Sequence, residues 1–275
     1  MIKWSPTDGF NASSVSMDDH GISVGDGIFE SMRVTPYGVF ALNRHLARLA
    51  HAASLIGIDL PPVANLRIGI DEVVAKLRAN SIADARLRLT ITSGVGPAGV
   101  LRGANINWFI TAAAIATTST PAKLQTSRIK RNEHSVVSEI KTLSYLENVI
   151  ALNEAVGAGF DEALLLNIAG EVAEAATCNL LFELDGELIT PPLSSGVLRG
   201  ITRELLIEKF AVREQVVQLE DLTQIAGAAL LSSIRGVQHI SHIDNRAIPG
   251  SALIAELTEK YQELLKSAAE YNLAI

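Results

Sequence analysis

A run of hydroxyl side chains followed by a proline, Thr117-Thr118-Ser119-Thr120-Pro121, divides this chain into two parts, each with its own helical and strand-like patterns. Clusters of this kind are typical of connections rather than of helices or strands. The chain has 275 residues, which exceeds the usual size of one compact core. We therefore predict a small N-terminal α/β domain over residues 1–117, a linker over 118–123 and a larger domain over 124–275.

The N-terminal part shows one clear helix and two strands. Residues 43–57 carry apolar side chains at helical spacing, with Asn43 placed to cap the start and Gly57 placed to end the helix. Residues 86–93 alternate between leucine or isoleucine and polar residues, which predicts a strand with one buried face. Residues 106–115 form a second strand-like run.

The C-terminal part mixes short strands with helices. A helix through Asn148 and Ala155 should end at Gly157 or Gly159, and Asp185-Gly186 predicts a hairpin turn. The remaining expected elements are strands at 163–168, 179–184, 188–189 and 228–232, a helix from Ile201 to Phe210, and a last helix that carries Leu253, Leu257, Tyr261, Leu264 and Ala268. The predicted fold class is therefore α+β in two parts.

Charge and cysteine content exclude several functions. The net charge of -7 and the absence of a Lys/Arg-rich stretch argue against nucleic-acid binding. Cys178 is the only cysteine and the six histidines are scattered, so we expect neither a disulfide framework nor a metal site. The single cysteine fits a reducing cytoplasm, and no apolar run reaches about 18 residues, which predicts a soluble protein that does not span a membrane.

Three segments carry more chemistry than packing requires. Lys141 stands just before a predicted helix, beside Tyr145 and Asn148, although on composition alone it would be a solvated amine. The loop from Thr190 to Arg203 is rich in proline and glycine and runs into a helix start, where free N–H groups suit a phosphate; an ordinary capped connection is the alternative. A turn over residues 170–179 offers carboxylates, whose default role is solvation. Nucleotide-binding, metalloprotease and serine-hydrolase motifs are absent.

Together these segments resemble the class IV aminotransferase family, the fold type IV enzymes of pyridoxal 5′-phosphate (PLP). The resemblance spans nearly the whole chain, and its order and spacing match the family. Its segments are Asp18–Gly21, Gly25–Ser31, Leu42–Leu49, Ser138–Asn148, Glu174–Phe182, Thr190–Arg203 and Leu231–Ser233. The resemblance implies a two-domain α+β fold like that of D-amino acid aminotransferase, with a β-barrel-like C-terminal domain.

The resemblance also implies a cofactor site. Lys141 matches the lysine that bonds covalently to PLP and moves a proton on the substrate. Glu174 matches the carboxylate that faces the pyridine nitrogen, and Arg48 matches the arginine that pairs with the cofactor phosphate. The remaining matches are a phosphate cradle of Ile201, Thr202, Ser233 and Ile234, the ring-packing Leu198, and the neighbouring Tyr145 and Asn179.

Three reactions share such a site, and the substrate-side residues favour one. Ser31 and the run from Lys141 to Asn148, Lys-Thr-x-x-Tyr-x-Glu-Asn, resemble the 4-amino-4-deoxychorismate lyases, which release pyruvate and 4-aminobenzoate, a folate precursor. A transaminase acting on D-amino acids, amines or branched-chain amino acids is the alternative. Expected substrate contacts are Phe29 and, for a carboxylate, one of Arg33, Arg88, Arg102 and Arg235. The family further implies a homodimer, and the intact lysine, Glu174 and Arg48 count against a binding protein without catalysis.

Overall fold

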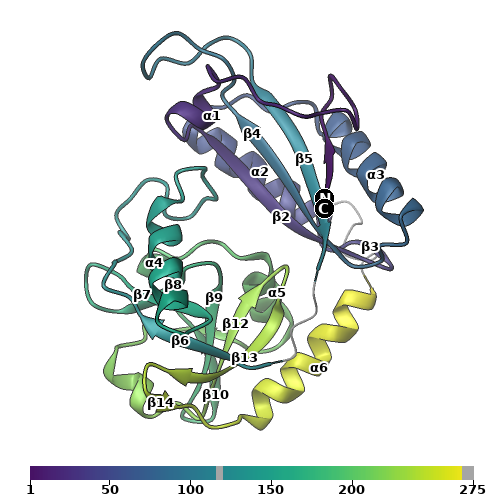
Figure 1. Ribbon diagram of the computed structural model, residues 1–275. Helices are drawn as coiled ribbons and strands as arrows, with labels where there is room; N and C mark the ends of the chain where they lie inside the picture. The colour runs from purple at the N-terminus through teal and green to yellow at the C-terminus, as the bar shows by residue number, and fades with distance from the viewer. Residues whose placement is uncertain (116–119, 268–275) are drawn as a thin grey trace. The chain divides into compact units, whose positions relative to one another are not determined.

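The computed structural model describes residues 1–115 and 120–267. These residues form two compact units (Figure 1): the first unit holds residues 1–115, 140–144 and 265–267, and the second unit holds 120–139 and 145–264. Part of the predicted linker, residues 118–119, lies outside the described residues, as does Ala268. The predicted domain bounds stay a prediction. The structure adds that residues 140–144, beyond the linker, belong to the first unit.

The first unit is a five-stranded antiparallel sheet with helices on one face (Figure 1), in the strand order β1-β5-β4-β2-β3. Its elements are β1 (Ile2–Trp4), α1 (His20–Ser23), β2 (Gly27–Thr35), β3 (Gly38–Val39), α2 (Leu42–Ile56), α3 (Val63–Ala79), β4 (Ala85–Thr92) and β5 (Asn107–Ala114). Helix α2 packs on β2, and α3 packs on β1 and β5. Gly69 of α3 lets the helix approach closely, since a Cβ there would lie 2.7 Å from the Trp4 ring.

The burial of alternate residues shows which side of this sheet the helices cover. In β2 the even-numbered Ile28, Met32 and Val34 are fully buried toward the helices, and in β4 the odd-numbered Leu87 and Leu89 are buried. Neighbours in sequence point to opposite faces of a strand. The opposite side, which we call the open face, therefore displays Phe29, Ser31 and Arg33 from β2, Arg86, Arg88 and Thr90 from β4, and Phe109 and Thr111 from β5.

The second unit is a curled nine-stranded sheet with helices α4 (Leu146–Gly157), α5 (Ile201–Lys209) and α6 (Ala252–Lys266), the last of which ends in residues 265–266 of the first unit. Its strand order is β11-β10-β9-β12-β13-β6-β7-β8, with β14 on β13, and β8 turns tightly back onto β9. The strands are β6 (Ala122–Thr126), β7 (Glu162–Leu166), β8 (Val172–Ala175), β9 (Asn179–Leu184), β10 (Glu187–Thr190), β11 (Arg213–Glu214), β12 (Gly227–Ser232), β13 (Gly236–Ile243) and β14 (Arg246–Ala247).

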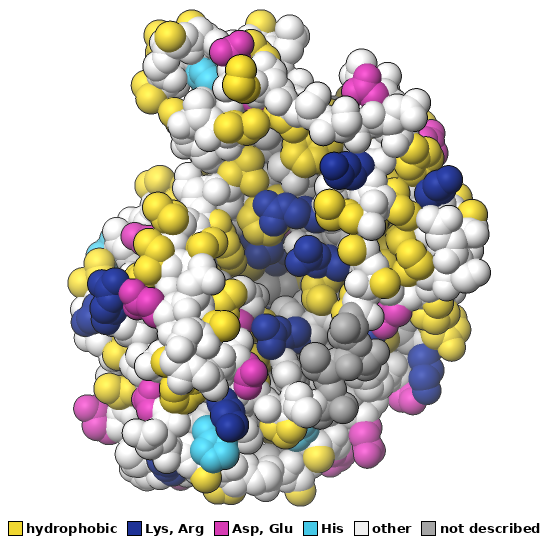
Figure 2. Space-filling model, viewed as in Figure 1, with side chains coloured by type: hydrophobic (Ala, Val, Ile, Leu, Met, Phe, Trp, Pro, Cys, Tyr) yellow, Lys and Arg dark blue, Asp and Glu magenta, His cyan; other side chains and the backbone are white. Residues whose placement is uncertain are grey.

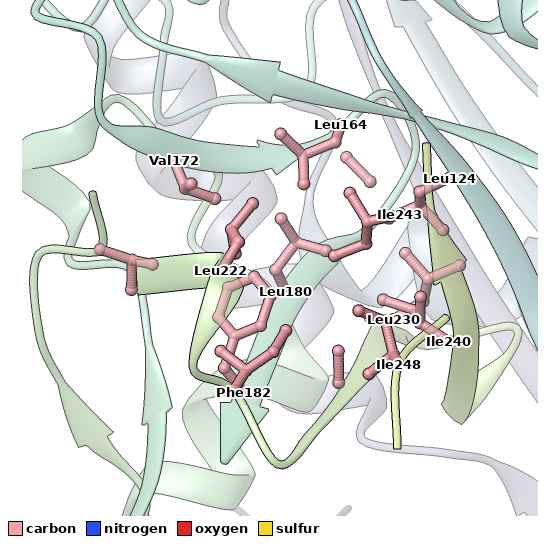
Figure 3. Close-up of a cluster of buried hydrophobic side chains, with 14 of the residues drawn as sticks. Leu124, Leu164, Val172, Leu180, Phe182, Leu222, Leu230, Ile240, Ile243 and Ile248 are labelled. Atoms are coloured by element: carbon pink, nitrogen blue, oxygen red, sulfur yellow. The ribbon is translucent and has the colours of Figure 1, made fainter. Parts of the chain in front are cut away.

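An apolar cluster fills the curl of this sheet (Figure 3), with Leu180, Phe182 and Leu230 fully buried at its centre. Burying each such side chain stabilises the fold by roughly 1.5–3 kcal/mol. The predicted strand 179–184 and its Asp185-Gly186 turn are confirmed, with positive φ at both turn residues. The mixed sheets and helices confirm the α+β class.

Acidic, basic and apolar side chains are all exposed on the face shown in Figure 2. Within the described residues no helix is long and apolar enough to cross a membrane. The same part of the chain contains no group of three or more His, Cys, Asp or Glu side chains that could hold a metal ion.

Candidate active site

Lys141 is fixed by backbone pairing to the start of β2. The Phe29 N–H donates to the Lys141 carbonyl at 2.9 Å, and the Leu143 N–H donates to the Gly27 carbonyl at 2.9 Å. A side chain at position 27 would not fit, because a Cβ would lie 2.5 Å from the Ile91 carbonyl oxygen. The Lys141 Nζ lies 4.6 Å from the centre of the Phe29 ring. The lysine is therefore held over the open face.

Arg88 and Ser31 share this part of the open face. The Arg88 guanidinium lies 3.6 Å from the centre of the same Phe29 ring, and its Nε donates to the Thr90 hydroxyl at 3.3 Å. Arg88 and Lys141 are thus within about 8 Å of each other, the sum of their distances to the ring centre. Ser31 stands directly opposite Arg88 in the β2–β4 pairing. An amine, a guanidinium and a hydroxyl therefore converge here.

The other three arginines expected near a substrate carboxylate have acidic partners. Arg33 makes a bidentate ion pair with Asp84, and Arg102 makes one with Asp26 while also donating to two backbone carbonyls. Arg235 lies in the second unit, 3.5 Å from Glu162. Among the four candidates, Arg88 is the one that lies beside Lys141.

Arg48 belongs to a buried charge network that the sequence did not reveal. Its guanidinium donates to both oxygens of Glu30, at 2.8 and 2.6 Å, and the His45 Nδ1 lies 2.7 Å from the same carboxylate. Burial alone would raise the pKa of Glu30, but the charge of Arg48 and the hydrogen bonds from His45 and Arg48 lower that pKa to about 2. Burial lowers the pKa of His45, only partly offset by the attraction of Glu30. Glu30 is therefore an anion, and neutral His45 donates to it.

This network predicts loss of stability in acid. Because the folded pKa of His45 is below its usual value near 6.5, its contribution is complete above that value and declines as the pH falls below it. Glu30 adds a second loss as the pH falls from about 4.5 toward 2. As the pH falls from 7.5 to 5.5, the unfolding free energy should therefore decrease, as measured by urea denaturation.

The variant His45→Gln isolates that contribution, because its amide can still donate to Glu30 but does not titrate. We expect it to weaken the pH dependence of the unfolding free energy in this range, whereas His51→Gln, on the exposed side of the same helix, should leave that dependence intact. An unchanged pH dependence in His45→Gln would contradict the assignment.

In the second unit, Glu174 is a buried carboxylate that accepts hydrogen bonds and forms an ion pair with an arginine. The Leu198 N–H donates to it at 2.9 Å, the Asn179 side-chain amide donates at 3.1 Å, and the Arg131 Nε lies 3.3 Å away. Asn179 also donates to the Leu198 carbonyl at 3.0 Å, which joins β9 to the loop before α5. Such a set of donors stabilises the charged form of a carboxylate. Arg131 is a member of this site that the sequence did not suggest.

Tyr145 lies in the same unit, where its hydroxyl and the Asn148 amide both reach the Ala176 carbonyl, at 3.4 and 2.8 Å. Burial, reinforced by the negative charge of Glu174, raises the pKa of Tyr145 above its usual value, so its hydroxyl stays protonated. Tyr145 and Asn148 therefore fix the turn between Glu174 and Asn179.

The expected phosphate cradle consists of two backbone features of the second unit. Helix α5 begins at Ile201 after Gly200, without a side-chain cap, and the Thr202 hydroxyl lies 3.1 Å from the Tyr261 hydroxyl. Ser233 and Ile234 form the turn between β12 and β13, where the Ser232 hydroxyl accepts from the Arg235 N–H at 3.1 Å. Uncapped N–H groups at a helix start suit a phosphate. The cofactor roles of these residues stay predictions.

Comparison with known proteins agrees with this geometry. The family model "Amino-transferase class IV" matches residues 27–243. A "Putative branched-chain-amino-acid aminotransferase" of Methanocaldococcus jannaschii is 33% identical over 92% of this chain and 91% of that protein. The 4-amino-4-deoxychorismate lyase of Pseudomonas aeruginosa has a TM-score of 0.83 at 27% identity, covering 96% of this chain and 100% of that chain.

A second similar structure is a complex. The T.th. branched-chain amino acid aminotransferase, complexed with N-(5′-phosphopyridoxyl)-L-glutamate, has a TM-score of 0.87 at 26% identity, covering 98% of this chain and 96% of that chain. The family match spans well over half of the chain, which confirms the resemblance and the expected cofactor. The chain belongs to the amino-transferase class IV family and is a PLP-dependent enzyme.

Proposed function

We propose that this enzyme is a 4-amino-4-deoxychorismate lyase. The observation that carries the proposal is the convergence of Lys141, Arg88 and Ser31 on the open face. A substrate that offers an amine to Lys141 and a carboxylate to Arg88 meets a hydroxyl one strand away. The likeness to the P. aeruginosa lyase supports this assignment.

The residues of the chain fit the cofactor. Lys141 supplies a primary amine on a backbone that is held to β2 through the Lys141 carbonyl and the Leu143 N–H, and Glu174 supplies a buried carboxylate suited to a protonated ring nitrogen. Gly200 keeps the helix start bare, because a Cβ there would lie 1.8 Å from the Asn179 Oδ1. When bound, PLP supplies an electron sink for the carbon that bears the amine.

The proposed step moves one proton and breaks one bond. Lys141 takes the proton from the carbon that bears the substrate amine, and the C–O bond to the enolpyruvyl group then breaks. The departing group gains a proton and leaves as pyruvate, while the ring becomes aromatic 4-aminobenzoate. We assign Ser31 to the relay of that proton, because its hydroxyl lies on the same face as Lys141 and opposite Arg88.

Replacing Ser31 tests this role. Ser31→Ala should lower the rate of 4-aminobenzoate release by about tenfold to a hundredfold, since a positioned proton donor contributes on that order or more. Thr111→Ala is the matched control, because Thr111 flanks Arg88 on the other neighbouring strand and carries a hydroxyl on the same face. An equal decrease in the rate of 4-aminobenzoate release in both variants would contradict the role of Ser31 in proton relay.

The deciding assay compares two products from purified, PLP-loaded protein. Release of 4-aminobenzoate from 4-amino-4-deoxychorismate is scored against keto-acid formation from D- and L-amino acids with 2-oxoglutarate or pyruvate. Rapid keto-acid formation without 4-aminobenzoate would establish the transaminase alternative. That alternative is supported by the 33% identity to the M. jannaschii protein.

A homodimer in the cytoplasm is part of the proposal. Both features come from the family resemblance and the single cysteine. A solution mass of one chain, independent of concentration, would contradict the dimer.

A further inference from the structure

Positively charged side chains form successive rows along the open face. The β2–β4 pairing sets Phe29 opposite Thr90, Ser31 opposite Arg88, and Arg33 opposite Arg86. Side chains on one face of a strand recur every second residue, which separates the rows by about 7 Å. Lys141 lies over the first row, so the rows form a line that runs away from the reactive amine.

The row formed by Arg33 and Arg86 keeps a net positive charge. Two arginines directly opposite each other repel, but Asp84 neutralises Arg33 through two hydrogen bonds. Arg86 is exposed to solvent, and no acidic side chain pairs with it within the described residues. Its guanidinium thus contributes the remaining positive charge of that row.

Arg88 leans away from Arg86 and toward Lys141. Its Nε bonds to Thr90, and its guanidinium lies on the Phe29 ring, both in the first row. The two guanidinium groups, two positions apart on β4, therefore serve two different stretches of the open face. A ligand with a single carboxylate beside its amine needs only Arg88.

We propose that Arg86 is a specificity-determining residue that binds a second carboxylate, so that the preferred substrates are amines bearing two carboxylates. The inference rests on the proposed function only in taking Lys141 as the place where the substrate amine reacts. An amine with two carboxylates also fits a transaminase of dicarboxylic amino acids, so the inference stands or falls separately from the lyase reaction.

Ligands without an amine test this binding in the holoenzyme without any reaction. Terephthalate carries carboxylates at both ends of a ring, and benzoate carries one. Isothermal titration should show that the wild type binds terephthalate about tenfold more tightly than benzoate, as one additional charged hydrogen bond at a partly exposed position would give. Arg86→Gln should remove most of that preference and change benzoate affinity by less than about twofold.

Two variants serve as controls. Arg86→Lys keeps the charge and should keep most of the preference. Lys3→Gln removes a positive charge that lies on the same face, in the row of Arg88 but two strands away, and should leave the preference intact. Both positions 3 and 86 are exposed, so matching thermal unfolding of all variants is expected.

Three results would overturn the inference. They are equal affinity of the wild type for the two ligands, an unchanged preference in Arg86→Gln, and an equal loss in Lys3→Gln, which would indicate a general charge effect. Failure of the proposed function is seen elsewhere, as absence of 4-aminobenzoate in the product assay. The two failures are therefore distinguishable.

Discussion

Replacing Lys141 by alanine is expected to abolish the visible absorbance of covalently held PLP and to lower turnover by at least about a thousandfold. The amine is both the attachment point and the proton acceptor, so its loss removes two contributions to catalysis. The fold should survive, because the hydrogen bonds that hold this segment to β2 use backbone atoms of Lys141 and Leu143. Absorbance spectra and product assays of the PLP-supplemented variant measure both effects.

Lys130→Ala is the control for this experiment. Lys130 is an exposed lysine of the second unit, and its removal should leave the spectrum and the rate unchanged. Persistence of the cofactor band in Lys141→Ala, at wild-type stoichiometry after dialysis, would show that another amine holds the cofactor.

Local patterns predicted local structure well where periodicity was strong. The helix expected from Ile201 to Phe210 is α5, Ile201–Lys209, and the strand expected over 86–93 is β4, Ala85–Thr92. The expected cap of α2 was wrong: the helix starts at Leu42, preceded by Ala41 at φ 53, and Asn43 instead accepts a hydrogen bond from Arg67. The left-handed backbone conformation of Ala41 cannot be predicted from the sequence, because alanine rarely adopts it.

Strand β2 was missed for a related reason. It is buried over most of its length, so its polar and apolar residues do not alternate cleanly. The sequence feature that could have revealed β2 is Glu30. Its number is even, like those of the buried Ile28 and Met32, so its side chain lies on the face that the helices cover. A buried carboxylate on such a face needs hydrogen-bond donors, and His45 and Arg48 on the next helix were available to provide them.

The site itself depends on contacts between distant parts of the chain. Lys141 follows the linker in sequence but pairs with β2, more than a hundred residues earlier. The periodicity of apolar residues cannot reveal such pairing between distant segments of the chain. The family resemblance identified Lys141 and Glu174 as candidates, whereas the choice of Arg88 among the arginines required the register of β2 and β4 and the contact of Arg88 with the Phe29 ring.

Glu174→Gln is expected to lower turnover by at least about a hundredfold while the protein still holds its cofactor. A carboxylate at this position favours a protonated ring nitrogen, and an amide cannot, so the electron sink is weakened. The amide would also direct an N–H₂ group at donors that now converge on an anion: the Leu198 N–H, the Asn179 amide and Arg131. Turnover and the absorbance of the bound cofactor, measured on one preparation, separate the two effects.

Glu171→Gln provides the matched comparison. Glu171 lies in the hairpin formed by β7 and β8, which also carries Glu174, and its side chain is half-buried. Its carboxylate accepts hydrogen bonds from Asn167 and Ser195 at 2.9 and 3.3 Å, so it shares the chemistry of Glu174 but not its donors. We expect its turnover to stay within about threefold of the wild type, since its carboxylate has no part in the proposed reaction. Comparable losses in the two variants would mean that the hairpin needs both carboxylates for structure, and the assignment of Glu174 to the ring nitrogen would fail.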